Sequence, residues 1–293
     1  MLAALVSLPE PFDSPFMQRA LLEGLMLSVL GGLLGSWIVL RRLAFFTHGV
    51  GTAAFPGLVV AAPWGVAPQL TALGAALLYG GGVERLARTR RVATDAATGL
   101  LLVGALALGV VLASDVYESG TAVDRLLFGS LIGLRDRDLW LTAGVLVAVL
   151  GLDAALRRAW LAGGFDPTGA RALGVPTVVA DRLLLVAIAG AVVVALDAVG
   201  ALLVTTVFVI PAATARLLVD GVHSLRFAAV ALAAVEMVAG LWLADLLNVG
   251  PGPALAVLGG SVFAVTAAAA AVRGSDPLSR RHSRGLTPPG APV

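Results

Sequence analysis

The stretch that decides the fold is SWIVLRRLAFFTHGVGTAAFPG, residues 36–57. A long apolar segment ends in it at Arg41 and Arg42, and a second apolar segment begins in it near Val50. Between the two lies His48, an ionisable side chain beside the start of an apolar segment, where burial is costly and an ionisable residue usually has a function. The order of apolar segment, arginine pair and new apolar segment predicts helices that cross a membrane.

The composition of the whole chain is that of a membrane protein. Of the 293 residues, 59% are hydrophobic and 13% are charged, whereas about a quarter of the residues are charged in a soluble domain. Glycine is abundant, with 35 residues, and small residues let helix backbones approach closely in membrane bundles. The absence of cysteine excludes disulfides, thiolate metal sites and iron–sulfur clusters. The arginines stand at the ends of apolar segments and in the C-terminal tail, which gives no support for nucleic-acid binding.

Apolar segments that can cross a bilayer have roughly 20 residues each. The sequence predicts an all-α, polytopic transmembrane helix bundle of about eight or nine spans, the second of which is short enough to be a half-span. The expected spans are Ala20–Leu40, Val50–Ala62, Pro68–Val83, Thr98–Ala113, Leu139–Leu156, Val178–Leu196, Gly200–Val219, Leu225–Leu247 and Pro253–Val272. If nine spans alternate, most arginines fall on one side, which predicts a cytoplasmic C-terminus and an external N-terminus.

Outside these spans, the sequence predicts a C-terminal tail and one short apolar piece but no second folded domain. We expect residues 1–272 to form one transmembrane domain and residues 273–293 to form a disordered cytoplasmic tail, because the tail is rich in Pro, Gly, Ser and Arg. A short apolar piece at residues 124–134 cannot cross the membrane and is expected to lie in the interface or to fold back into the protein.

A short helix is predicted in the longest cytoplasmic connection. Asp166 is a good N-cap, Pro167 suits the first helical position, and Gly174 can end the helix in a left-handed conformation. These residues predict about two helical turns, from Pro167 to Leu173. The residues alone leave two interpretations open, a capped connector and an element that docks a cytoplasmic partner.

The segment VGALLVTTVFVIPAATAR, residues 199–216, predicts a kinked helix. Pro211 lies inside an apolar span and removes one helix hydrogen bond. Thr205, Thr206 and Thr214 can satisfy the freed backbone groups or form hydrogen bonds across helices. The kink is either a packing feature of a core helix or a hinge beside a pathway through the bundle.

Ionisable residues in or beside the spans are the candidates for chemistry. Glu236 is near the middle of its span, Asp197 lies between two spans, and Asp245 is near an outer end. A lone carboxylate in a membrane must face a polar cavity, pair with another group or stay protonated. We expect Glu236 to face the interior, while a solvated position at the interface is equally open for Asp197 and Asp245.

His48 is a candidate metal ligand, because neutral imidazole binds divalent transition metals and carboxylate or carbonyl oxygens can complete such a site. The alternative is a histidine that only reaches the interface beside the arginine pair. No P-loop, HExxH or GxSxG motif occurs, so the sequence carries no signature of an ATPase or a hydrolase.

Five motif regions, in the correct order, resemble the membrane permease subunit of ATP-binding-cassette importers for manganese, zinc and iron. These are FMQRALLEG with GGLLGSWIVLRRLAFF, TDAATGLLLVGALALGVVLAS, LLFGSL, FDPTGARALGVP and VGALLVTTVFVIPAATARLL. The last is the most specific, and the resemblance covers about residues 16–271. It implies a permease homodimer in the bacterial cytoplasmic membrane, together with two ATPase subunits and an extracytoplasmic metal-binding lipoprotein. It also implies that ATP binds to the partner and that this chain holds no cofactor of its own.

The resemblance gives a role to the short cytoplasmic helix, which in such importers fits a cleft on the ATPase. ATP-driven closure of the ATPase pair would then move the permeases between outward-open and inward-open states, with Pro211 as a hinge. The residues expected at the contact with the ATPase are Phe165, Asp166, Pro167, Arg171 and Gly174.

The metal site implied by the resemblance departs from the family pattern. Members commonly carry Gly-Asp-x-x-x-His-Ala after the arginine pair, with the Asp and His as metal ligands, whereas this chain has His48 and Thr52 at those positions. An imidazole–hydroxyl pair therefore replaces a carboxylate–imidazole pair and removes a negative charge. Either His48 and Thr52 keep a divalent site with help from Glu236 or Asp197, or the metal is not held there.

The expected function is inward transport of a divalent transition-metal ion, Zn²⁺ or Mn²⁺ with Fe²⁺ as a further candidate, by a permease that is not itself an enzyme. One alternative is a permease for a metal chelate such as an iron–siderophore complex, which needs a wider cavity and no direct metal ligand. A second alternative, from another class, is a proton-coupled secondary transporter in which Glu236 and Asp197 titrate.

Overall fold

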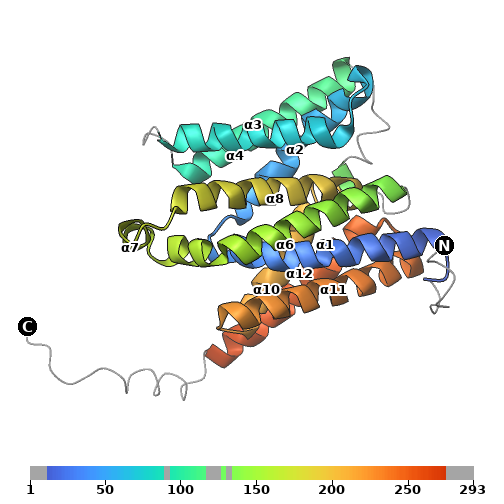
Figure 1. Ribbon diagram of the computed structural model, residues 1–293. Helices are drawn as coiled ribbons and strands as arrows, with labels where there is room; N and C mark the ends of the chain where they lie inside the picture. Colours follow the sequence, from blue (N-terminus) through green and yellow to red (C-terminus); the bar gives the residue numbers. More distant parts are fainter. Residues whose placement is uncertain (1–11, 89–92, 117–126, 130–133, 275–293) are drawn as a thin grey trace, which may run out of the picture.

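The computed structural model describes residues 12–88, 93–116, 127–129 and 134–274, and in these ranges it contains helices but no strand. The long helices lie side by side in one bundle (Figure 1). The elements are α1 (Pro15–Leu40), α2 (Ala44–Trp64), α3 (Pro68–Arg88), α4 (Thr94–Val111), the π-helical turn η1 (Leu112–Val116), α6 (Asp136–Phe165), α7 (Pro167–Ala172), α8 (Thr177–Val199), α9 (Val204–Phe208), α10 (Ile210–Leu218), α11 (Val222–Leu247) and α12 (Pro251–Gly274).

Each expected span corresponds to a helix or a pair of helices, which confirms the all-α membrane bundle. Among the described residues, seven helices are long and apolar enough to cross a membrane. They are α1, α2, α4 with its π-helical end, α6, α8, α11 and α12. The two remaining expected spans are α3, which is equally long but less apolar, and the pair α9 and α10.

The expectation that the second span is a half-span is wrong. Helix α2 has 21 residues and begins at Ala44, only a few residues after α1 ends. The connection is this short because Arg42 adopts a left-handed conformation, with φ 56°, and turns the chain at once. The polar residues before Val50 are therefore helical, and His48 lies in the first turns of α2 rather than in a loop.

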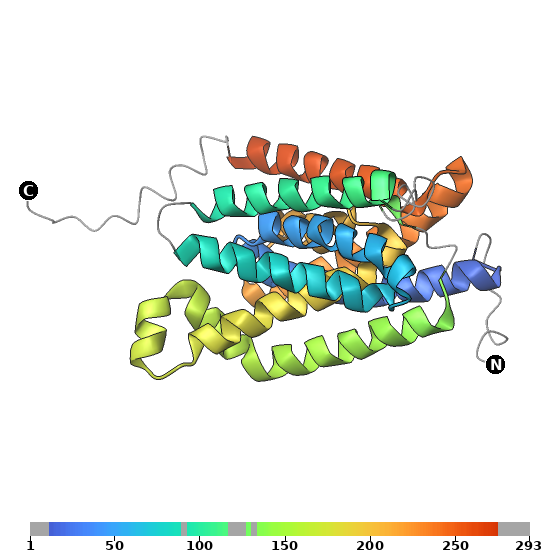
Figure 2. The same cartoon turned by 90° about the horizontal axis from the view of Figure 1, so that it is seen from above.

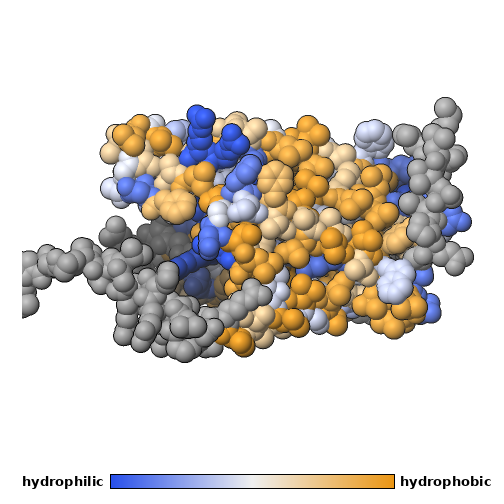
Figure 3. All heavy atoms as spheres, turned by 90° about the horizontal axis from the view of Figure 1, so that it is seen from below, coloured by the Kyte–Doolittle hydropathy of each residue, from blue (hydrophilic) through white to orange (hydrophobic). Residues whose placement is uncertain are grey.

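The two ends of the bundle differ in the elements that they carry. The start of α1 lies at one end, whereas α7 and the C-terminal end of α12 lie at the other, and the view from above shows the same division (Figures 1 and 2). A broad hydrophobic band covers most of the face between them (Figure 3). The end with α7 also carries the pairs Arg41–Arg42 and Arg157–Arg158, and we call it the arginine-rich end. This arrangement agrees with arginines that stay on the cytoplasmic side.

Helix α1 is central because it packs against six other helices, α2, α6, α8, α9, α10 and α11. In its most apolar 18-residue stretch, 67% is buried inside the bundle. Its glycines let other backbones approach: a Cβ added to Gly31 would lie 2.5 Å from the carbonyl oxygen of Val207, and one on Gly35 would lie 2.1 Å from that of Phe208. Such close contact through small residues is a typical means of helix association in membranes, where apolar burial alone gives little driving force.

The kink predicted at Pro211 is confirmed and is a complete break. Helix α9 ends at Phe208, α10 begins at Ile210, and Pro211 occupies the first turn of α10. Because proline has no N–H, the carbonyl group of Val207 loses the donor that it would have in a continuous helix. The hydroxyl of Thr214 donates a hydrogen bond of 2.9 Å to the carbonyl oxygen of Ile210, as expected for a threonine beside such a break.

Only part of the predicted apolar piece at residues 124–134 is described. Its residues 127–129 fold back onto the bundle, because Leu202 N–H donates to the carbonyl oxygen of Leu127 over 3.1 Å. Of the expected tail, residues 273–293, the first two residues end α12 and the others lie outside the described residues.

Candidate functional site

The short helix predicted outside the bilayer is present as α7, at the arginine-rich end (Figure 1). Asp166 caps it by accepting hydrogen bonds from the N–H groups of Thr168 and Gly169, at 3.1 and 2.9 Å. At the other end Gly174 has φ +77°, and its N–H donates to Arg171 while that of Val175 donates to Ala170, the pattern of a Schellman motif. The sequence thus determines both ends of α7.

The surface around α7 is apolar as well as polar. Phe165 is 76% exposed and Leu173 is 85% exposed, on either side of a helix whose other described residues are mostly exposed. Arg171 is exposed too, and its Nε–H donates a hydrogen bond of 3.3 Å to the hydroxyl of Thr177 at the start of α8. Large exposed apolar groups beyond the end of a membrane bundle are typical of a protein-binding surface.

His48 and Thr52 lie one turn apart on α2, which packs against α3, α4, α8 and α9. His48 is half-buried, while Thr52 is 1% exposed. The hydroxyl oxygen of Thr52 is buried and has no hydrogen-bond partner among the described residues. A buried polar atom without a partner costs free energy, so its presence here needs an explanation, and a transported ligand is one.

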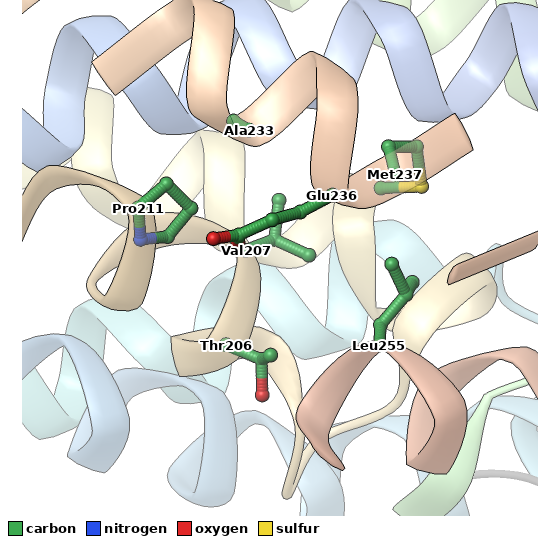
Figure 4. A pocket seen from close by; sticks show the side chains of 7 residues that line it. All are labelled: Thr206, Val207, Pro211, Ala233, Glu236, Met237 and Leu255. Atoms are coloured by element: carbon green, nitrogen blue, oxygen red, sulfur yellow. The ribbon is translucent and has the colours of Figure 1, made fainter. Parts of the chain in front are cut away.

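Glu236 is buried in the interior of the bundle, as the sequence predicts for it. It is 6% exposed and points into a cavity of about 10 Å³, room for about one water molecule. Figure 4 shows its carboxylate directed toward Pro211 at the start of α10. In the described part of the chain, one carboxylate oxygen of Glu236 finds no hydrogen-bond partner. The residues that line the cavity are Thr206, Val207, Pro211, Ala233, Glu236, Met237 and Leu255.

Asp197 and Asp245 have different surroundings. Asp197 is half-buried near the C-terminal end of α8 and accepts a hydrogen bond of 2.9 Å from the side-chain amide of Gln69 on α3. Asp245 is exposed near the end of α11, where it lines a larger cavity of about 330 Å³ between α1, α11 and α12. Both positions are at the end of the bundle opposite α7.

The structure does not bring the predicted acidic and imidazole ligands together within one chain. No group of three or more His, Asp or Glu side chains in the described ranges is placed to hold a metal ion. The three predicted ligands His48, Asp197 and Glu236 come from three different helices, α2, α8 and α11. In the described part of the bundle interior, buried side-chain oxygens of Glu23, Thr52 and Glu236 have no hydrogen-bond partner.

Several buried ionisable residues were missed in the sequence. Glu23 on α1 is 1% exposed and Asp153 on α6 is 6% exposed. Asp153 forms an ion pair with Arg226 of α11. The signal that identified Glu236, a charged residue inside an apolar span, was also present at Glu23 and Asp153.

The fold and these sites define a class of protein. A bundle of membrane-length helices with unpartnered polar groups in its interior, a broken helix beside one of them and a capped helix outside the apolar band is the architecture of a multi-pass transport protein.

Comparison with known proteins identifies the family. Residues 13–270 match the model of the ABC 3 transport family, and the chain belongs to this family. It is thus a membrane permease of the ATP-binding-cassette importer type and a multi-pass protein of the bacterial cytoplasmic membrane.

The relatives are similar over most of their length. The manganese transport system membrane protein MntC of Halalkalibacterium halodurans is 28% identical, over 85% of this chain and 86% of that protein. The manganese import system permease protein ScaB of Streptococcus parasanguinis is 30% identical, over 85% of this chain and 88% of ScaB. Among solved structures, PsaBC of Streptococcus pneumoniae, in complex with a Fab, has a chain with a TM-score of 0.79, 28% identity and coverage of 87% of this chain and 91% of that chain.

Proposed function

We propose that this permease moves a divalent transition-metal ion inward, with Mn²⁺ as the first candidate. The observation that carries the proposal is the match to manganese permeases over about the whole bundle, including one that is 30% identical. The same relatives favour a free ion over a metal chelate as the cargo. Zn²⁺ and Fe²⁺ remain the competing ions, since the imidazole and oxygen ligands available here also suit them.

The transported ion would pass His48 and Thr52. Support comes from the unpartnered hydroxyl of Thr52, one turn from an imidazole on the same helix. One chain supplies too few ligands at this place for a closed site, and a second copy of the permease across a dimer axis would double them. Glu236 and Asp197 would serve elsewhere along the pathway; support for this comes from the lack, in the described residues, of any group of three or more His, Asp or Glu side chains that could hold a metal ion.

The partners would be those of an ABC importer. Two ATPase subunits would bind and hydrolyse ATP, an extracytoplasmic lipoprotein would deliver the metal, and the permease would hold no cofactor of its own. We assign the ATPase contact to α7 and its flanks, because Phe165 and Leu173 expose apolar surface beyond the end of the bundle. The capped ends formed by Asp166 and Gly174 would keep this surface in a fixed shape.

The test is metal uptake into proteoliposomes that contain the permease and its ATPase, with the metal-binding lipoprotein supplied on the extracytoplasmic side. Wild type is compared with His48→Ala, and His223→Ala serves as the matched control, because His223 is an exposed histidine at the start of α11. We expect ATP-dependent Mn²⁺ uptake that is lost in His48→Ala and kept in His223→Ala. Unchanged uptake by His48→Ala would remove His48 from the pathway.

Two further outcomes separate the alternatives. Wild type that imports none of Mn²⁺, Zn²⁺ and Fe²⁺ as free ions would contradict the proposal and favour a chelate as the cargo. Uptake that needs a proton gradient but no ATPase would favour a proton-coupled secondary transporter.

A further inference from the structure

Helix α6 carries α7 and yet is poorly embedded in the bundle. It runs for 30 residues up to Phe165. Only 17% of its most apolar 18-residue stretch is buried inside the protein, against 67% for the corresponding stretch of α1. The main neighbours of α6 in the bundle are α8 and α1. Polar contacts add to this packing, because at three levels along its length α6 is hydrogen-bonded to α1 or to Arg41, the residue that follows α1.

The first level lies nearest the start of both helices. The hydroxyl of Thr142 donates a hydrogen bond of 2.7 Å to one carboxylate oxygen of Glu23. Both side chains are 1% exposed. In a site without competing water, such a contact is directional and keeps the two helices in register.

The second level centres on Asp153. Its carboxylate accepts a hydrogen bond of 2.9 Å from the indole N–H of Trp37 on α1, and it forms an ion pair with Arg226 on α11. The guanidinium of Arg226 also lies 5.9 Å from the centre of the Trp37 ring, within the range of a cation–π contact. One side chain of α6 is thus bound to both α1 and α11.

The third level lies next to α7. The guanidinium of Arg41 donates to the backbone carbonyl of Trp160 over 2.9 Å and pairs with Asp181 on α8. The Trp160 indole N–H donates to the carbonyl of Ala180 over 2.7 Å, and its ring meets that of Trp37 edge to face at 5.5 Å. Both helices that flank α7 are therefore joined to α1 at this level.

The spacing of the three levels fits a single line of attachment. Thr142, Asp153 and Trp160 are separated by close to whole helical turns, so they lie on one face of α6, roughly 16 and 10 Å apart along its axis. Their partners on α1 follow in the same order, Glu23, Trp37 and Arg41. The charges of the second and third levels balance, because Arg226 pairs with Asp153 and Arg41 pairs with Asp181. This pairing lowers the free-energy cost of burying the four side chains.

We propose that these three polar levels make α6, α7 and α8 one rigid unit with α1 and α11, so that the ATPase acting on α7 moves the helices that line the interior. In this unit, the side chains of Asp153, Trp37 and Arg226 act on transport indirectly, because they hold α6 in position against α1 and α11. The inference rests on the proposed function, because it takes α7 as the ATPase contact.

The consequence for transport follows from the neighbours of α1 and α11. Gly31 of α1 touches the backbone of Val207 in α9, and α11 carries Glu236 beside Pro211. A displacement of α7 that reaches α1 and α11 therefore changes the surroundings of the broken helix and of Glu236. Without the polar levels, α6 could shift along α1, and ATP would be hydrolysed without moving these residues.

The experiment measures Mn²⁺ uptake and ATP hydrolysis together in proteoliposomes that contain the full complex. Trp37→Phe removes the indole N–H together with the smaller ring of the indole and keeps one aromatic ring, and Arg226→Gln removes the charge opposite Asp153. Arg182→Gln is the matched control, because Arg182 pairs with Glu84 over 3.2 Å in an exposed position at the same end. For both test variants we expect ATP turnover within twofold of wild type and Mn²⁺ uptake per ATP lowered about fivefold or more, the lower end of typical coupling between sites.

The ratio of uptake to ATP turnover separates this proposal from a structural role. Loss of uptake and ATP turnover in equal proportion would mean that the contacts only stabilise the fold, and would overturn the proposal. An unchanged ratio in both test variants would overturn it too. A wild-type complex that imports no Mn²⁺ at all would instead contradict the proposed function.

Distances between spin labels test the rigid unit directly. The chain has no cysteine, so Thr168→Cys on α7 and Ser224→Cys on α11 would carry the only labels of the permease. In complexes in which only one of the two permease copies carries the labels, we expect one narrow distance distribution that stays the same with ADP and with ATP plus vanadate, and a broadened one in Arg226→Gln. A nucleotide-dependent change in wild type of more than about 5 Å, a one-turn shift of one helix past another, would show that α7 and α11 move separately and would refute the proposal.

Discussion

Gly35 is the position at which the structure makes the sharpest stability prediction. It lies on α1 where α9 ends and α10 begins, and a Cβ at this position would be 2.1 Å from the carbonyl oxygen of Phe208 and 3.0 Å from the Cβ of Ala212. The first contact is with backbone, which cannot rotate away as a side chain can. The Gly35→Ala variant must therefore push the broken helix away from α1 by roughly 1 Å before the contact becomes a normal one.

The expected cost follows from this displacement. Overpacking of a well-packed interior typically costs about 1–3 kcal/mol, and the tight backbone contact places Gly35→Ala at the upper end of that range. With roughly 2–4 °C of Tm per kcal/mol for a large domain, the melting temperature should fall by roughly 6–12 °C. The assay is thermal unfolding of the purified permease in detergent, followed by tryptophan fluorescence.

The matched control is Gly144→Ala on α6. No atom lies within 4 Å of a Cβ added to Gly144, so the same substitution meets open space there. We expect its melting temperature to equal or slightly exceed that of wild type, because alanine favours helix over glycine. If Gly35→Ala melts at the wild-type temperature, then α1 does not approach α10 as closely as described, and the reasoning fails.

Three further predictions concern α7, Glu236 and the helix break. Asp166→Ala removes the cap of α7, which is worth about 1 kcal/mol in a helix. We expect it to lower the ATP turnover that the permease stimulates in its ATPase, and normal turnover would mean that ATPase docking does not depend on this cap. Glu236→Gln keeps the shape of the side chain and removes its charge, so membrane levels should match wild type while Mn²⁺ uptake falls at least tenfold, and unchanged uptake would leave Glu236 outside the pathway. Pro211→Ala returns an N–H for the carbonyl of Val207, which should raise the melting temperature and lower the rate of uptake; a faster transporter would contradict a role for the break as a hinge.

The sequence determined the elements whose causes are local. The apolar spans follow from length and composition, so each expected span has a counterpart among the described helices. Asp166, Pro167 and Gly174 fix the ends of α7 through hydrogen bonds within a few residues of themselves. Pro211 breaks its helix for an equally local reason, the missing N–H.

A local pattern also gave one wrong expectation. The polar residues around His48 suggested that the second span was short, whereas α2 extends through them from Ala44. Helices in a packed bundle can include residues that a hydropathy window leaves out, because neighbouring helices cover them. Thr47, for example, lies before the expected span and is buried although its side chain is polar.

Only the tertiary structure decided which buried charges have partners. Asp153 and Arg226 lie on helices far apart in the sequence, and nothing in the spacing of either residue pairs them. The same holds for Thr142 with Glu23, and for Gln69 of α3, which donates a hydrogen bond to Asp197. Hydropathy indicates the free-energy cost of placing a charged residue in the membrane. Whether hydrogen bonds and ion pairs offset that cost depends on contacts with other helices, which are set by how the whole bundle packs. For that reason the sequence could identify Glu236 as buried, and only the fold could show that one of its oxygens is left without a partner in the described chain.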